Sequence, residues 1–154
     1  MAAKRAAPAA LLFIALTLTA GPAASDTVRG STSERIVRGL DAFDRRAADS
    51  SASLDTRDLA DAALLALLSG RGPSRAQSYL ARVFAAQDTN PGSPTYGNFR
   101  WRSGDARVTD RNAVEFVAQA LGPAALQFSG QFSPPFKTQL DAAVSAALTG
   151  IRQH

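Results

Sequence analysis

The stretch that decides the fold runs over residues 56–87 and reads TRDLADAALLALLSGRGPSRAQSYLARVFAAQ. In its first half, apolar residues recur at spacings of three and four, which predicts a helix over 56–69. Its second half repeats this spacing and predicts a helix over 73–87, opened by proline. Because the glycine-containing connection, residues 70–72, is so short, the two helices must be antiparallel neighbours. The stretch therefore predicts a helical hairpin.

The chain on the N-terminal side of this hairpin carries the same spacing. Apolar residues from Ile36 to Ala47 form a helical stripe and predict a helix over 33–47. Residues 25–32 are small and polar, and we expect them to form a flexible lead-in. Alanine makes up about one residue in five. Alanine favours helix, but each alanine buries little apolar area. The outer faces of the helices can therefore need a packing partner.

The C-terminal side also predicts helices. One is expected to be capped by Thr109 or Asp110 and to end at Gly122 and Pro123, with a short turn over 124–128. The last helix is expected to start at Pro134 after an N-cap at Ser133. Between the two halves lies a long stretch rich in turn-forming residues, 88–108. We therefore predict an all-α fold of antiparallel helical hairpins with one long irregular loop.

The N-terminus has the three parts of a secretory signal peptide. Lys4 and Arg5 precede an apolar run over 9–20, and small residues follow it. The run is too short for a spanning helix, so we expect no membrane association after the leader is cleaved. The expected organisation is a signal peptide over 1–24, the lead-in over 25–32 and a single helical domain over 33–154. We therefore expect an exported protein, periplasmic or extracellular; an uncleaved leader or a buried N-terminal helix is the alternative.

The composition excludes several classes of site. The chain has no cysteine and one histidine, His154 at its end, which argues against disulfides, thiolate chemistry, a Ser-His-Asp triad and a histidine-rich metal site. The net charge of +4 falls to +2 without Lys4 and Arg5. Arginine and aspartate alternate over 41–49, which is typical of a solvated helix face rather than of a nucleic-acid interface. We expect no nucleic-acid partner, no metal and no cofactor.

The long loop holds the only tryptophan of the chain within the run YGNFRWR, residues 96–102. Loops of this length in compact domains are often functional. Aromatic faces beside amide and guanidinium groups suit a sugar ring and its hydroxyls, and a guanidinium can also fork onto the carboxylate of a uronic acid. The candidate carbohydrate-binding residues are Tyr96, Asn98, Phe99, Arg100, Trp101 and Arg102. In an extended segment, the two arginines would share one face and the aromatics Phe99 and Trp101 the other.

A structural interpretation of the same loop stays open. The two aromatic side chains can plug the loop onto the helices, with Arg100 and Arg102 bridging to Asp105 or Asp110. An extended pair around Phe99 and Val108 is the only strand candidate. Glycoside hydrolysis needs two carboxylates in a defined geometry, which sequence proximity does not establish. Asp110 also fits a helix cap and Glu115 fits a surface position, so no catalytic residue is assigned.

The runs NPGSPTYGNFRWR, residues 90–102, and VTDRNAVEF, residues 108–116, resemble a signature of large bacterial secreted proteins of the α/α-toroid class, the architecture of six-hairpin glycosidases and polysaccharide lyases. The resemblance implies helical hairpins around a central cleft, with carbohydrate bound by loops at one rim. This chain resembles the N-terminal part of such a protein. It departs from the pattern in supplying about two hairpins and one extra helix, where a toroid has six pairs.

These observations lead to one expected function and two alternatives. We expect an exported helical domain associated with carbohydrate binding or processing, with an oligo- or polysaccharide as its ligand and no catalytic activity alone. The first alternative is an N-terminal fragment of a toroid glycoside hydrolase or polysaccharide lyase, whose missing C-terminal hairpins would complete the ring. The second alternative is a helical module that packs against a protein partner.

Overall fold

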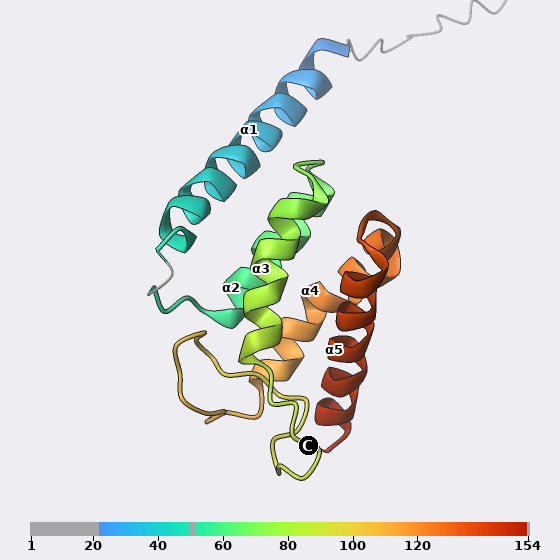
Figure 1. Ribbon diagram of the computed structural model, residues 1–154. Helices are drawn as coiled ribbons and strands as arrows, with labels where there is room; N and C mark the ends of the chain where they lie inside the picture. The colour runs from blue at the N-terminus through green and yellow to red at the C-terminus, as the bar shows by residue number, and fades with distance from the viewer. Residues whose placement is uncertain (1–21, 50–51, 154) are drawn as a thin grey trace, which may run out of the picture.

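The computed structural model describes residues 22–49 and 52–153, and these residues form an all-α fold (Figure 1). The helices are α1 (Pro22–Ala47), α2 (Thr56–Leu68), α3 (Pro73–Ala86), α4 (Ala113–Phe128) and α5 (Pro134–Arg152), with a 3₁₀ turn at Ser129–Gln131. The only extended pairing among the described residues consists of two isolated bridges. The predicted fold class is confirmed.

The α2–α3 hairpin is the centre of the molecule. Its connection turns through two glycines with positive φ, Gly70 at 67° and Gly72 at 95°, a region in which other residues are strained. Helix α2 packs against α3 on one side and against α4 on the other, and α4 packs on α5. The chain therefore forms two antiparallel hairpins, α2–α3 and α4–α5, as the short connections predict.

The core between these helices consists largely of small and branched apolar side chains. Leucine and valine side chains from four helices are completely or almost completely buried: Leu59, Leu80, Val83, Val114, Val117, Leu121 and Leu140. Buried alanines line the same contacts, Ala63 and Ala66 on α2 among them. Because alanine ends at Cβ, the helices approach closely, but each alanine buries less apolar area than a leucine.

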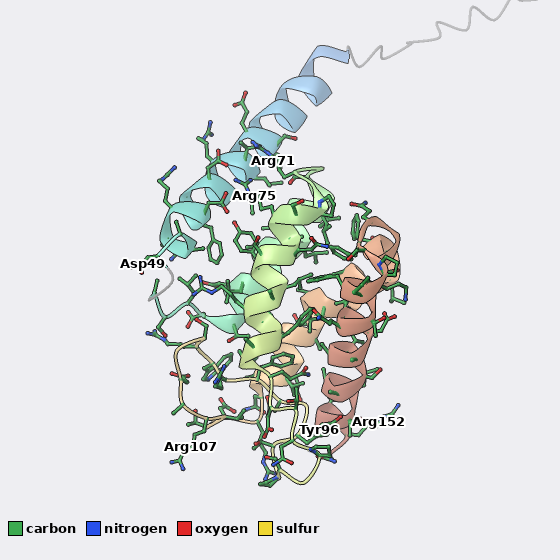
Figure 2. The ribbon with its side chains drawn as sticks, in the orientation of Figure 1. Asp49, Arg71, Arg75, Tyr96, Arg107 and Arg152 are labelled. Atoms are coloured by element: carbon green, nitrogen blue, oxygen red, sulfur yellow. The ribbon has the colours of Figure 1, made fainter. Side chains whose placement is uncertain are left out.

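Helix α1 lies against the hairpin with its C-terminal half and extends beyond the rest of the molecule with its N-terminal half (Figure 1). Phe43 contacts the ring of Tyr79 on α3 edge-on, with 5.2 Å between centroids. Arg75 of α3 reaches across to α1 (Figure 2), where it pairs with Asp41 at 3.0 Å and also with Asp44. Asp44 in turn accepts a hydrogen bond from the Tyr79 hydroxyl. These polar contacts fix the position of α1 along α3.

The N-terminal boundary differs from expectation. Residues 25–32, expected as a flexible lead-in, belong to α1, which begins at Pro22. Once a helix is nucleated, each further residue adds a hydrogen bond, so small polar residues without proline can extend it. The predicted signal peptide, residues 1–24, lies outside the described residues except for its last three. None of the helices in the described ranges combines the length and the apolar character that crossing a bilayer requires.

Helix α4 also differs from expectation, because it does not end at Gly122 and Pro123. It continues to Phe128 with the proline inside it, and residues 124–128 are part of the helix rather than a separate turn. Leu121 and Ala124, on either side of this pair, are both buried. Packing of both flanks against the core therefore outweighs the one helical hydrogen bond that proline removes. Helix α5 begins at Pro134 after Ser133, as predicted.

Candidate functional site

The long loop connects α3 to α4, and its middle is held against α5 by a close backbone contact. Gly97 has φ +81°, and a Cβ at this position would lie 1.9 Å from the carbonyl oxygen of Ala146. A Cβ at Gly150, the facing residue on α5, would lie 3.1 Å from the carbonyl oxygen of Tyr96. The buried Gln87 side chain joins the same two segments, since its amide donates to the carbonyls of Gly97 (3.0 Å) and Ala143 (2.9 Å).

Asn98 serves the fold at the start of α4. Its side chain is almost completely buried, and its Oδ1 accepts hydrogen bonds from the backbone N–H groups of Phe99 (2.7 Å) and Val114 (3.0 Å). Its Nδ2 donates to the carbonyl of Arg111 at 2.6 Å. The first N–H groups of a helix have no partner inside the helix, so Asn98 caps α4 from 16 residues away. Of the two residues expected as caps, Asp110 accepts the N–H of Asn112 just before α4, at 2.9 Å, while the N–H of Val114 inside the helix is satisfied by Asn98.

The segment after Asn98 is extended and pairs with two other parts of the chain. The N–H of Arg100 donates to the carbonyl of Ala86 at 3.0 Å. On the other edge, Thr56 donates its N–H to the carbonyl of Trp101 (2.8 Å) and its hydroxyl to that of Arg100 (2.6 Å). Phe99 bridges to Gln87, not to the neighbourhood of Val108, which was the expected partner. Residues 99–102 are thus clamped between the start of α2 and the end of α3.

Burial falls along this segment, which bends at Trp101. Phe99 is completely buried, and Trp101 is partly buried with its ring 5.7 Å from that of Phe116. Arg100 is partly buried, and Arg102 is exposed. Neither guanidinium pairs with Asp105 or Asp110, the acid partners proposed in the structural interpretation of the loop. Arg102 pairs instead with Asp55 at 3.3 Å, and Arg100 donates to the carbonyl of Ala85.

A hollow of about 640 Å³ lies beside Trp101; we call it the Trp101 hollow. Its other lining residues all carry a charge: Asp55, Arg57, Asp58, Asp61, Arg102 and Asp105. The start of α2 supplies four of these seven residues, and the loop supplies the rest. Arg57 pairs with Asp61 at 3.6 Å while lying over the ring of Phe116, 5.2 Å from its centroid.

The acidic side of this hollow was not predicted from the sequence. Asp55, Asp58 and Asp61 recur every third residue at the start of α2, so they fall near one another on the helix surface. This spacing is visible in the sequence and could have predicted an acidic helix face. The closeness of these aspartates to Trp101 could not have been predicted, because it depends on the pairing of Thr56 with the loop. The described residues contain no group of three or more acidic or histidine side chains arranged to hold a metal ion.

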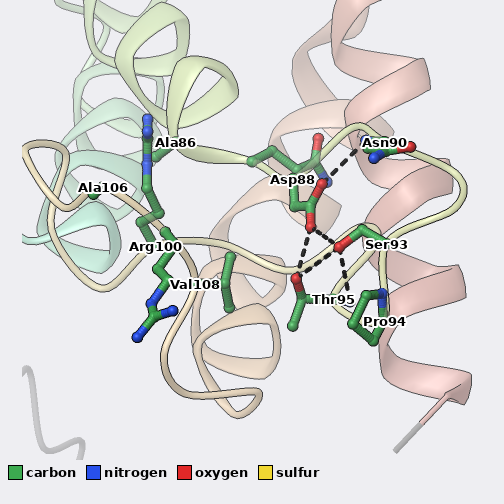
Figure 3. Close-up of a pocket in the computed structure, with 11 residues that line it drawn as sticks. Ala86, Asp88, Asn90, Ser93, Pro94, Thr95, Arg100, Ala106 and Val108 are labelled. Atoms are coloured by element: carbon green, nitrogen blue, oxygen red, sulfur yellow. Dashed lines mark hydrogen bonds between the residues drawn. The ribbon is translucent and has the colours of Figure 1, made fainter.

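A second hollow, of about 520 Å³, lies next to Arg100; we call it the Asp88 hollow (Figure 3). The Asp88 carboxylate accepts hydrogen bonds from the hydroxyls of Ser93 (2.5 Å) and Thr95 (2.6 Å) and from the N–H of Asn90 (3.1 Å). Burial alone would raise the pKa of Asp88, but these three hydrogen bonds outweigh burial and hold the pKa below its ordinary value.

Tyr96 lies apart from both hollows. Its side chain is partly buried and borders a shallow apolar recess of about 300 Å³ together with Phe84 and residues of α5. The structure therefore divides the six predicted residues among four places. Trp101 and Arg102 line one hollow and Arg100 lines another, Tyr96 borders the recess, and Asn98 and Phe99 are buried in the fold.

Comparison of the chain with protein-family models, with curated proteins and with solved structures found no match. The resemblance to the α/α-toroid class therefore stays a prediction. The architecture described above shows two helical hairpins and one further helix within residues 22–49 and 52–153.

Proposed function

We propose that this chain is an exported helical domain that binds oligosaccharide or polysaccharide at the Trp101 hollow and is not catalytic alone. The observation that carries the proposal is a partly exposed indole in the wall of a hollow whose other lining side chains are all charged. The volume of about 640 Å³ falls in the range of small-ligand sites, roughly 300–1,000 Å³.

The chemistry of the lining suits a polyhydroxylated ring. The C–H face of a sugar is apolar and can stack on the indole, while its hydroxyls need donors and acceptors around their rim. The carboxylates of the hollow accept hydrogen bonds, and Arg57 and Arg102 donate them. Four carboxylates against two guanidiniums leave the lining with a net charge of −2, which favours neutral or amino sugars over acidic ones.

The state of the carboxylates supports binding rather than hydrolysis. Asp55 and Asp61 pair with arginines, and Asp105 accepts the backbone N–H of Arg102 at 3.0 Å. The Asp58 carboxylate forms no hydrogen bond or ion pair with another residue of the described ranges. Glycosidases of the common mechanisms use two carboxylates across the scissile bond, whereas three of the four here are already engaged by the protein.

A fluorescence titration tests the proposal. Because Trp101 is the only tryptophan, the emission of the full chain reports on this hollow alone. We expect a saturable change on titration with a panel of neutral, amino and acidic oligosaccharides. Asp58→Asn keeps the reporter and should weaken binding by about tenfold, the value of one hydrogen bond to a charged group. Glu115→Gln, an exposed carboxylate outside the hollow, is the matched control. Unchanged emission across the whole panel would overturn the proposal.

A second candidate function, a helical interaction module, is supported by the groove between α1 and α2. This groove of about 440 Å³ has an apolar floor that includes Leu40 and Phe43. Leu65, at its edge, is 40% exposed. Arginines of α1 and aspartates of α2 line opposite sides, so the groove is complementary in charge to a copy of itself rotated by a two-fold axis. The occupant that fits this pattern is a second copy of the chain.

The alternative of a toroid fragment rests on the sequence resemblance and stays a prediction. It is tested by the reading frame beyond His154. Further helical hairpins encoded in frame would support it, and a stop codon directly after His154 would contradict it.

A further inference from the structure

The Asp88 hollow has a charge balance opposite to that of the Trp101 hollow. Its wall contains two guanidiniums, Arg100 and Arg107, and a single carboxylate, Asp88. In Figure 3, Arg100 and Val108 lie on one side of the hollow, and the hydrogen-bonded group of Asp88, Ser93 and Thr95 lies on the other. The lining therefore has a net charge of +1.

Asp88 does not neutralise the two arginines. Its carboxylate oxygens already accept three hydrogen bonds, from Ser93, Thr95 and the N–H of Asn90, and it forms no ion pair with Arg100 or Arg107. The guanidinium of Arg107 forms no hydrogen bond or ion pair with any residue that the structure describes. The positive charge in this wall is therefore available to an outside partner.

The second observation concerns Arg100. Its Nε is shielded from water and has no acceptor, the only such side-chain nitrogen or oxygen within residues 32–49 and 52–153. Buried donors are almost always satisfied, because leaving one unpaired costs its full desolvation penalty. The backbone of this residue is clamped on both sides, so the side chain cannot easily withdraw. Because Nε is shielded, the part of this guanidinium left for an outside acceptor is Nη1, which has no hydrogen-bond partner among the described residues, whereas Nη2 donates to the carbonyl of Ala85.

We propose that the Asp88 hollow binds an oxyanion, the carboxylate or sulfate group of a small acidic ligand, between Arg100 and Arg107. A guanidinium presents parallel N–H donors that match paired acceptor oxygens. One oxygen would accept a hydrogen bond from Nη1 of Arg100, and Arg107 would help to balance the negative charge. This site shares no lining residue with the Trp101 hollow and does not depend on the function proposed for it.

The test is an NMR titration of the full, ¹⁵N-labelled chain, observing the Nε–Hε signals of the arginines and the backbone amides of Ser93 and Thr95. Sodium glucuronate and sodium sulfate are the probes. Sodium chloride at matched ionic strength and neutral glucose are the controls. We expect a saturable shift of the Arg100 Nε–Hε signal with glucuronate, sulfate or both. A response to glucuronate alone assigns a planar carboxylate, and a response to sulfate alone assigns a tetrahedral anion.

Two variants separate specific binding from general charge attraction. Arg107→Gln should weaken binding by about threefold to fivefold, the range of a partly exposed ion pair. Arg152→Gln removes an exposed arginine of α5 that does not line the hollow and should leave the affinity unchanged (Figure 2). The proposal is overturned if the shifts do not saturate, if chloride reproduces them, or if the two variants weaken binding equally.

Discussion

Replacing Asn98 by alanine should cost this small domain a large share of its stability. The side chain is 1% exposed and satisfies three backbone groups: the N–H of Phe99, the N–H of Val114 and the carbonyl of Arg111. Alanine leaves all three without this partner. Phe99 and Val114 are themselves completely buried, so water reaches their N–H groups poorly.

The magnitude follows from the two buried donors. An unsatisfied buried N–H costs about 1–3 kcal/mol, so two of them cost roughly 2–6 kcal/mol, and we take about 3 kcal/mol as the expected loss. With an m-value of about 2 kcal/mol/M, the midpoint of urea unfolding should fall by about 1.5 M. Emission of Trp101, three residues away on the same clamped segment, follows the transition.

The matched control is Asn90→Ala, the same substitution on the same loop. Asn90 is exposed, and its Oδ1 accepts one hydrogen bond, from the N–H of Gly92 at 3.0 Å. Its loss should cost less than about 1 kcal/mol, because water replaces the partner. If Asn98→Ala and Asn90→Ala lower the midpoint to the same extent, Asn98 does not hold the start of α4 and the reasoning is wrong.

Three further predictions concern packing, ionisation and association. Gly97→Ala should lower the free energy of urea unfolding by about 3–5 kcal/mol, because the new Cβ meets the α5 backbone at a positive φ. The control Gly92→Ala, whose new Cβ has its nearest neighbour 3.6 Å away, should lower it by less than about 1 kcal/mol. Equal losses would contradict the close contact. Burial and the hydrogen bond to Asp44 raise the pKa of Tyr79 above its ordinary value of 10.0, so the folded state keeps this proton after the unfolded state has lost it. The free energy of unfolding should therefore fall as the pH rises above about 10, by up to about 1.4 kcal/mol per pH unit. Tyr79→Phe should reduce that fall in unfolding curves measured between pH 9 and pH 11. If the variant shows the same pH dependence as the unchanged chain, Tyr79 is not its source. If the groove between α1 and α2 joins two copies, sedimentation velocity should show a dimer that Leu65→Glu converts to monomer, whereas a monomer at all concentrations would exclude this interface.

The candidate site was predictable in part, and the division follows sequence distance. The alternation of aromatic and basic side chains over 99–102 is a local property, and the structure has the aromatics on the core side. Asn98 has an amide that suits a sugar hydroxyl and a helix cap equally well. Only its position 3.0 Å from the N–H of Val114 assigns it to the cap. Residue type therefore indicates what a side chain can bind, and its neighbours determine which of these partners it meets.

The sequence alone determined the helices and their pairing, because apolar spacing and glycine-rich connections act over a few residues. The α2–α3 hairpin and the start of α5 follow from such local patterns. Only the tertiary structure decided that α4 passes through Pro123, because burial of both flanks compensates the broken hydrogen bond. It also decided that the aspartates of α2 meet Trp101 in one hollow while Arg100 faces another. The contacts between the start of α2 and Trp101 join residues about 40 positions apart, and no local preference specifies such a pairing.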